Sequence, residues 1–346
     1  MPETRTAATG TRTAAVRGSA PSRPAAATKR QPSPARRLIV VAVLVAVAAT
    51  CFLSLFVKGS FEFAIERRLI LLGAITVAAF AQGVGTVVFQ TVTHNRILTP
   101  SLMGFDAVYT LMQTLMVFVF GGSVLATTDG LPKLLTQTLL MVAFTTLLFR
   151  WLFSGPTGSL HVLLLAGVVL GIAFQSLSVF LQRLLSPADY DVLSTRLFGR
   201  LSTVEATHLP LAFAVCAVCA VVLWRRRHRL DVLLLGRDTA RGLGLDHRRE
   251  LTTALIVVAV LVSFSTALVG PMTFFGFTAA LLAYQFAGTH QHAFVLPMAF
   301  LLGLLTLLTG QFVMEHVLYA SGMLTVVIEF LGGAVFLTHL LRRGSL

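Results

Sequence analysis

The chain has 346 residues, of which 56% are hydrophobic and only 12% are charged, with a formal net charge of +13. Because soluble globular domains carry about 25% charged residues, this composition excludes an ordinary water-soluble fold and predicts a membrane protein. The positive charge lies largely in residues 1–37, in Trp224–Arg229 and at the C-terminus, beside apolar segments. Such flanking charge is typical of membrane topology signals, so we expect no nucleic-acid partner.

The first 36 residues differ from the rest of the chain. They are rich in Ala, Thr, Pro, Ser and Arg and show no apolar periodicity, which predicts a disordered basic tail over residues 1–36. Residues 37–346 are then expected to form one transmembrane domain. The apolar run Leu38–Val57 is longer than the core of a signal peptide and has no clear cleavage site, so we interpret it as the first membrane span.

Ten apolar segments follow in chain order. A helix needs roughly 20 mostly apolar residues to cross the hydrocarbon layer. The segments of that kind are 38–57, 68–92, 101–121, 131–153, 160–182, 206–224, 251–269, 272–288, 293–314 and 323–341. The predicted fold class is therefore an all-α polytopic membrane protein with about ten transmembrane helices. Only Gly270-Pro271 separates the seventh segment from the eighth, which favours a tight or re-entrant hairpin there.

Basic residues give the expected topology. With ten spans, the tail and the basic groups near residues 94–96, 225–249 and 342–343 fall on one side, which the positive-inside rule assigns to the cytoplasm. Both termini are then cytoplasmic. Arg67 and Arg68 fall on the opposite side, together with Arg183, Arg196 and Arg200, and these exceptions require a role.

A polar hinge lies between the second and third spans. Asn95, Thr99 and Pro100 favour a turn followed by a new helix start. Gln90 precedes this turn, and Gly104 follows it at a position that allows close approach of helices. From these residues alone, a plain corner between two helices explains the pattern equally well.

The long cytoplasmic loop Leu230–Arg249 is predicted to contain a short helix. Asp238 suits its cap or first turn, and Gly242 or Gly244 suits its end. Such a helix, rich in small residues, can fit a cleft on a partner protein. The alternative is an amphipathic surface loop held by anionic lipid.

Chemistry-bearing residues are sparse. The phosphate-loop pattern G-x-x-x-x-G-K-[ST] is absent from the sequence, so this chain is not expected to hydrolyse ATP. The nine His residues are scattered, which predicts neither a catalytic nor a metal site. Cys216 and Cys219 lie in an apolar run and are interpreted as small hydrophobic residues. Glu329 is costly within a span, and an interhelical hydrogen bond is favoured over a role in lining a pathway.

Four separated segments resemble, in order, the iron–siderophore (FecCD-type) ABC importer permeases. The first is Gln90 with Asn95-Arg96-Ile97-Leu98-Thr99-Pro100 and Gly104, which is similar to the catecholate or mixed-ligand siderophore branch. The others are Phe198–Ser202, the pattern Leu235-Gly236-x-x-x-Ala240-x-x-Leu243-Gly244, and Val269–Phe277 with the later Gly310-Gln311 and Ile328–Phe336. Two departures are Arg237, where the family commonly has Glu, and the missing Pro-His-x-x-Arg after Gly276.

The resemblance implies the fold of the cobalamin and iron–siderophore permeases and a permease subunit for ferric siderophores in the cytoplasmic membrane. Separate ATPase subunits would bind and hydrolyse ATP, so the chain needs no cofactor of its own. The partners would be those ATPases, a second permease (a heterodimer first, a homodimer as the alternative) and an extracytoplasmic siderophore-binding protein. Alternatives are import of cobalamin, haem or another metal chelate, and a gradient-driven secondary transporter.

The resemblance also implies roles for particular residues. The ATPase-coupling loop would consist of Leu235, Gly236, Arg237, Asp238, Ala240, Leu243 and Gly244. The translocation path or hinge would include Gln90, Asn95, Pro100, Gly104, Pro271 and Gly276. The binding protein would dock at Arg67 and Arg68.

Overall fold

The structure is a computed structural model and describes residues 33–55, 61–123, 130–153, 160–197, 201, 204–319 and 324–343. Within those ranges it is built from helices and their connections, without a β-strand. The first helix, α1, begins at Pro34, where Ser33 accepts a hydrogen bond from the backbone of Arg36 as an N-cap. The transmembrane unit therefore starts slightly before residue 37, and the rest of the predicted tail lies outside the described residues.

Each of the ten predicted spans coincides with helical structure. The second span is a continuous rod of three pieces, and the other nine are single helices. Their bounds are α1 Pro34–Ser54, α2 Phe61–Ala78 with η1 Ala79–Val84 and α3 Gly85–Thr93, α4 Phe105–Phe120, α6 Leu131–Phe153, α7 Leu160–Gln182, α9 Leu209–Leu233, α11 His247–Val269, α12 Phe275–Ala287, α13 His292–His316 and α14 Leu324–Arg343.

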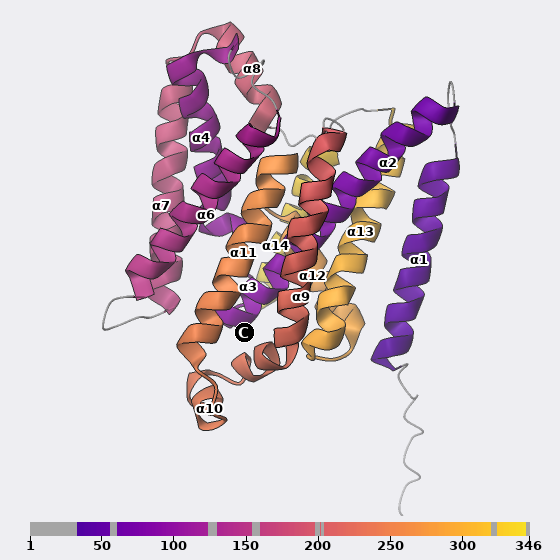
Figure 1. Cartoon of the computed structure of the whole chain (residues 1–346), viewed down its shortest axis with the longest axis vertical. Helices are drawn as coiled ribbons and strands as arrows, with labels where there is room; N and C mark the ends of the chain where they lie inside the picture. Colours follow the sequence, from indigo (N-terminus) through magenta and orange to yellow (C-terminus); the bar gives the residue numbers. More distant parts are fainter. Residues whose placement is uncertain are drawn as a thin grey trace, which may run out of the picture. The chain divides into compact units, whose positions relative to one another are not determined.

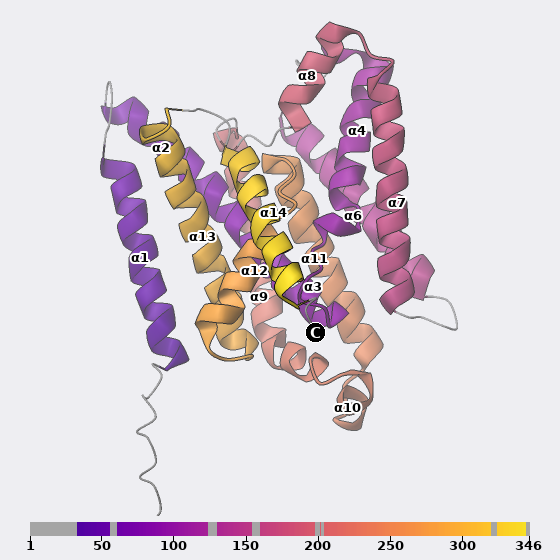
Figure 2. The same ribbon diagram turned by 180° about the vertical axis from the view of Figure 1, so that it is seen from behind.

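Length and composition agree with this assignment. Within the described residues, six helices are long and apolar enough to cross a membrane, and four shorter apolar helices accompany them. Two short helices lie between spans, α8 (Pro187–Leu197) and α10 (Arg237–Gly242). In both views α10 lies at the opposite end of the helical unit from α8, and α1 begins and α14 ends at the α10 end (Figures 1 and 2).

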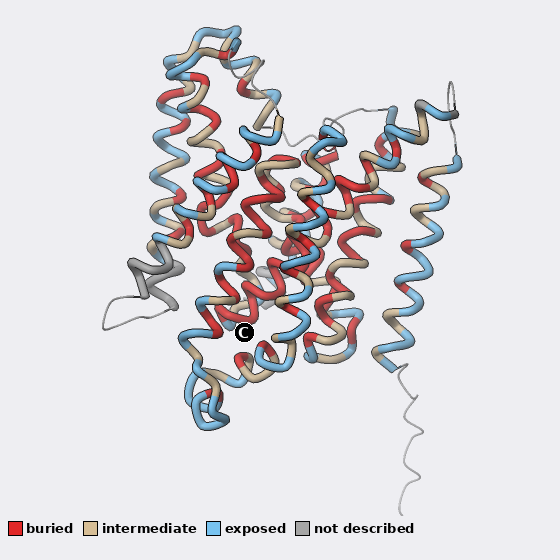
Figure 3. The backbone as a smooth tube through the Cα atoms, viewed as in Figure 1, coloured by how far each residue is buried: buried red, intermediate tan, exposed pale blue. Residues whose placement is uncertain are grey.

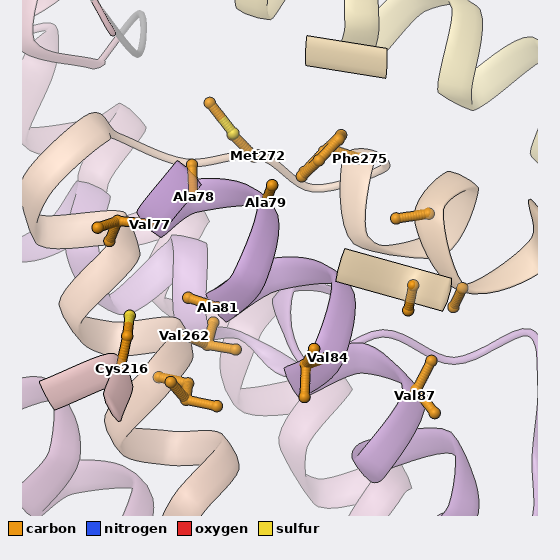
Figure 4. Packing of buried hydrophobic residues seen from close by; sticks show 14 of the residues in the cluster. Val77, Ala78, Ala79, Ala81, Val84, Val87, Cys216, Val262, Met272 and Phe275 are labelled. Carbon is orange, nitrogen blue, oxygen red and sulfur yellow. The ribbon is translucent and has the colours of Figure 1, made fainter. Parts of the chain in front are cut away.

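The core is centred on the rod formed by α2, η1 and α3. In the most apolar stretch of this rod 78% of the residues are buried, whereas in that of α1 only 17% are buried. Figure 3 shows the buried positions concentrated in the middle of the helical unit. The central piece η1 is a π-helix, which widens the helix locally. The small side chain of Ala81 in η1 lies beside Val262 of α11 (Figure 4).

A close backbone contact explains why small residues occupy η1. A Cβ atom on Gly83 would lie 3.0 Å from the carbonyl oxygen of Ala299 in α13. The rod therefore packs almost backbone to backbone against α13, as small residues permit in membrane helices. The sequence analysis did not predict the π-helix.

The connection between the seventh and eighth spans is short but is not a two-residue hairpin. Gly270 adopts a φ of +87°, which favours glycine, and α12 begins only at Phe275. With 13 residues and about 1.5 Å per residue, α12 rises roughly 20 Å, less than the ~30 Å hydrocarbon layer.

Candidate coupling segment and membrane hinge

The short helix predicted within the loop Leu230–Arg249 exists as α10. Gly236 immediately precedes it with a φ of +92°, and Asp238 lies in its first turn. The helix ends at Gly242, and Gly244 has a φ of +80°. The two positive φ values are ones that glycine adopts readily, so they set the sharp turns on either side of α10. We call residues 235–244 the coupling segment.

The coupling segment presents apolar side chains outward. Ala240 is fully buried where α10 packs against α9 and α11. Leu235 and Leu243 are 58% and 64% exposed, with the exposed Arg237 and Asp238 between them. Exposed large apolar residues rimmed by charges are typical of a protein-binding surface.

A buried acid fixes the two helices that carry this segment. Glu250 of α11 has a side chain only 6% exposed, and it accepts hydrogen bonds from Arg226 at 2.6 Å and Arg229 at 2.5 Å. Both arginines lie in α9, which continues past the predicted end of the sixth span at Trp224. The basic cluster is therefore helical, and part of it positions the coupling segment.

Replacing Glu250 with glutamine should destabilise the packing of α9 against α11. Glutamine has one acceptor oxygen where the carboxylate uses two, and it lacks the charge that offsets two guanidinium groups. We expect a loss of about 1.5–3 kcal/mol in the free energy of unfolding. A lowered melting temperature of the purified chain in detergent would show it. Asp246→Asn, at the exposed cap of α11, is the control and should change little.

The hinge after α3 is held by side-chain-to-backbone hydrogen bonds. His94 ends α3 with a φ of +52°, which is rare for a residue other than glycine. Asn95 Oδ1 accepts from the backbone N–H of Ile97 at 2.9 Å, and buried Gln90 donates to the carbonyl of Arg96 at 2.7 Å. These bonds fold the hinge tightly beneath the end of α3, as the turn chemistry predicted.

Gly104 joins the hinge to the body of the protein. Pro100 starts a single turn of 3-10 helix, η2 (Ser101–Met103), and Gly104 then adopts a φ of +98° before α4. A Cβ on Gly104 would lie 3.1 Å from the Cα of Gly171 in α7. The predicted role of Gly104 in close helix packing therefore has a defined partner, α7.

The two other residues assigned to the path or hinge, Pro271 and Gly276, lie around the start of α12. Gly276 is buried, and a Cβ there would clash with Oγ1 of Thr86 in α3. This position gives Gly276 a packing function between α12 and α3 within the chain. Pro271 is partly buried in the connection before α12.

Two acidic side chains hold that connection from either side. Asp106 of α4 accepts a hydrogen bond from the Thr273 hydroxyl at 2.8 Å. Glu329 of α14 accepts from the backbone N–H of Phe274 at 3.2 Å. The interhelical hydrogen bond favoured for Glu329 is therefore present. Asp106, in the first turn of α4, was given no role of its own from the sequence.

Replacing Glu329 with glutamine should leave transport unchanged. The glutamine oxygen can accept the same hydrogen bond from Phe274 N–H, so the connection before α12 keeps its position. We expect the substrate uptake rate of the variant to be within a factor of two of wild type in cells with equal amounts of chain in the membrane. A loss of uptake with normal abundance would instead give the Glu329 charge a role in transport.

Arg67 and Arg68 occupy different environments. Arg67 is exposed, whereas Arg68 is only 7% exposed and turns inward. The Arg68 guanidinium donates to the carbonyl oxygens of Phe52 and Leu55, at 2.9 and 2.7 Å, and lies 3.3 Å from Nε2 of His316. Arg68 thus secures the end of α1, and its burial makes it less accessible to a partner than the exposed Arg67. Docking of a binding protein at these two residues stays a prediction.

The segment Phe198–Ser202, assigned to the outer entrance, lies almost wholly outside the described residues. The short helix α8 precedes it, and Asp189 at its start accepts hydrogen bonds from Ser186 at 2.7 Å and from the backbone of Gly122 at 2.7 Å. The hydrogen bond from Ser186 is the larger cause that lowers the pKa of Asp189 below its usual value, and that from Gly122 adds to it. Asp189 therefore ties α8 to the end of α4.

Comparison with known proteins identifies the family. The model of the FecCD transport family matches residues 37–342. The chain belongs to the FecCD transport family. It is a multi-pass membrane permease of that family, and the assignment of the four sequence segments to this family is confirmed.

Particular relatives extend over nearly the whole chain. The petrobactin import system permease protein FatC of Bacillus anthracis is 37% identical, with 94% of each chain covered. The petrobactin permease YclO of Bacillus subtilis is also 37% identical, with 90% of this chain and 99% of YclO covered. A solved inward-facing structure of a metal-chelate type ABC transporter matches with a TM-score of 0.76 at 20% identity, over 89% of this chain and 99% of that one, and this supports the fold.

Proposed function

We propose that this chain is the permease subunit of an ABC importer for ferric siderophores in the cytoplasmic membrane. The observation that carries the proposal is the 37% identity to two petrobactin permeases over at least 90% of this chain. A ferric chelate of the catecholate or mixed-ligand class is the first substrate to test. The chain itself would supply no cofactor and no ATP chemistry.

Separate ATPase subunits would dock on the coupling segment. Its exposed leucines, Leu235 and Leu243, flank the charged helix α10. This helix packs against α9 and α11, which buried Glu250 joins through ion pairs. ATP binding by the partners would move this surface and shift the permease between outward-open and inward-open states. The permease contributes two conformations, and the differential binding of its partners sets their populations.

Two further partners complete the proposed importer. A second permease, as a heterodimer first and a homodimer as the alternative, would enclose the translocation path. An extracytoplasmic binding protein would deliver the chelate, with exposed Arg67 pairing with an acidic group on it. Charge complementarity of this kind chiefly sets the rate and specificity of docking.

Radiolabelled ferric-siderophore uptake in a deletion strain tests the function. Wild-type chain should restore uptake, and a variant with residues 235–244 scrambled should fail while present in the membrane at equal amount. Catecholate, hydroxamate and citrate chelates would be compared, with ferric petrobactin first. No uptake defect in the deletion strain for any of these would overturn the siderophore proposal and direct attention to cobalamin, haem or another chelate.

A further inference from the structure

A buried histidine connects the residues before the coupling segment to the hinge side of the membrane domain. His292 is the first residue of α13, and its side chain is only 2% exposed. Its Nδ1 donates to Oδ1 of Asp231 at 2.6 Å, and its backbone N–H donates to the same oxygen at 2.8 Å. Its Nε2 lies 2.8 Å from the hydroxyl of Thr91 in α3. One side chain thus bridges three helices that are distant in sequence.

The position of Asp231 gives this bridge its significance. Asp231 lies in the last turn of α9, four residues before Leu235, where the coupling segment begins. Its carboxylate acts as a cap for the N-terminus of α13, where negative charge is favourable. A displacement of the coupling segment that moves the end of α9 therefore pulls directly on α13.

A second bond links the same part of α9 to the hinge. The Leu233 carbonyl accepts from Nε2 of His94 at 2.8 Å. His94 is the residue with a φ of +52° that ends α3 and opens the hinge. An unusual backbone conformation at a nonglycine residue persists only where its surroundings hold it, and this bond is one such restraint. The end of α9 thus reaches α3 directly through His94 and indirectly through His292 and Thr91.

A cavity lined mainly by polar residues lies beside these bonds. It has a volume of about 170 Å³ and is lined by Gln90, His94, Arg96, Tyr284 and His290, together with Leu234 and His292. A polar cavity of this size holds water readily. Bonds across a hydrated cavity can be exchanged for bonds to water, which a dry, closely packed interior would not permit.

We propose that His292 is a positioning residue for coupling, which transmits movement of the coupling segment through Asp231 to α13 and through Thr91 to α3. The inference rests on the proposed function, because it assumes that ATPase partners act on residues 235–244. His292 touches neither ATP nor chelate. Its loss should separate ATP hydrolysis from transport while the subunits remain assembled.

The test compares matched variants of the full chain in the assembled importer with its ATPase and binding protein in proteoliposomes. Thr91→Val removes the hydroxyl that faces His292 while preserving side-chain shape. Thr93→Val is the control, since Thr93 is also buried in α3 but, among the described residues, its hydroxyl bonds only carbonyls of its own helix, Phe89 at 2.9 Å and Gln90 at 3.5 Å. His292→Asn can still reach Asp231 but is too short to reach Thr91.

The readout is the amount of ferric chelate transported per ATP hydrolysed. Thr91→Val and His292→Asn are expected to lower this ratio at least five-fold at unchanged ATPase content and melting temperature, whereas Thr93→Val leaves it at the wild-type value. The double variant should transport no less chelate per ATP than His292→Asn alone, because both changes remove the contact between Thr91 and His292. The Thr91 hydroxyl also bonds the Val87 carbonyl and Tyr284, so His292→Asn is the variant that isolates the bridge. Equal ratios for Thr91→Val and Thr93→Val would overturn the inference, and so would a fall in ATPase content or melting temperature that alone accounts for the loss.

Failure of the proposed function would give a different result. If wild-type importer shows no ATP-dependent chelate uptake, or if scrambling residues 235–244 leaves uptake intact, the functional assignment itself fails. If wild type transports and depends on that segment, while the Thr91 and His292 variants keep the wild-type ratio, only the role of His292 is wrong.

Discussion

Arg68→Met is expected to destabilise the permease by about 3 kcal/mol, because the charge-assisted hydrogen bonds to the carbonyls that end α1 are lost together. The methionine keeps an apolar side chain of similar reach but cannot donate to Phe52 and Leu55. Those carbonyls would then lose the hydrogen bonds from Arg68, in a part of the protein where unpaired polar groups are costly. Thermal unfolding of the purified chain in detergent should show a clearly lowered midpoint.

Arg67→Met is the matched control. Arg67 is the neighbouring residue on the same helix but is exposed, so its replacement should change the free energy of unfolding by no more than about 0.5 kcal/mol. Charge reversal at Arg67 should weaken binding of the extracytoplasmic protein without loss of folding. Equal melting temperatures for the Arg68→Met variant and wild type would contradict the structural role given to Arg68.

Gly104→Ala should cost about 2–4 kcal/mol, from the left-handed backbone conformation and from overpacking together. Its φ of +98° disfavours a side chain, and the new Cβ would lie 3.1 Å from the Cα of Gly171. The hinge would have to shift away from α7, so we also expect reduced chelate uptake at normal temperature. Melting curves and uptake in the deletion strain check the two effects.

Variants of two other glycines distinguish the cost of the left-handed backbone conformation from the cost of overpacking. Gly171→Ala creates the same close contact, 3.0 Å from the Cα of Gly104, without a positive φ, and it should cost only about 1–3 kcal/mol. Gly242→Ala is a control in α10, since no atom lies within 4 Å of its Cβ position. If Gly104→Ala were no more destabilising than Gly242→Ala, the close packing of the hinge on α7 would be contradicted.

The sequence predicted the elements that depend on local pattern. Span positions follow from apolar length alone, and the end of α10 follows from Gly242 because a helix stop is a local property. Asp238 lies in its first turn, as predicted. The functional assignment of residues 235–244 came from their resemblance to the family and stays a prediction. The end of α9 was placed too early, because a run of arginines in a helix reads as a loop when its partner Glu250 is unknown.

Other features depend on contacts between residues that are far apart in the sequence. His292 meets Asp231 across 61 positions and Thr91 across 201 positions, and no spacing in the sequence indicates these pairs. Arg68 resembled an exposed docking charge because its carbonyl partners belong to another helix. The π-helix η1 had only a weak signal, a run of small residues between Ala78 and Gly85 that also suits an ordinary packed helix.

The central claim is that ATP, through separate ATPase subunits on residues 235–244, drives import of a ferric chelate by this permease. The most direct measurement is accumulation of radiolabelled ferric siderophore in proteoliposomes that contain the assembled importer and its binding protein. We expect the ferric siderophore to accumulate in the proteoliposomes only when ATP is present. This accumulation should persist after ionophores collapse the proton and sodium gradients, and it should be lost when residues 235–244 are scrambled. Accumulation driven by an imposed gradient without ATP would contradict it.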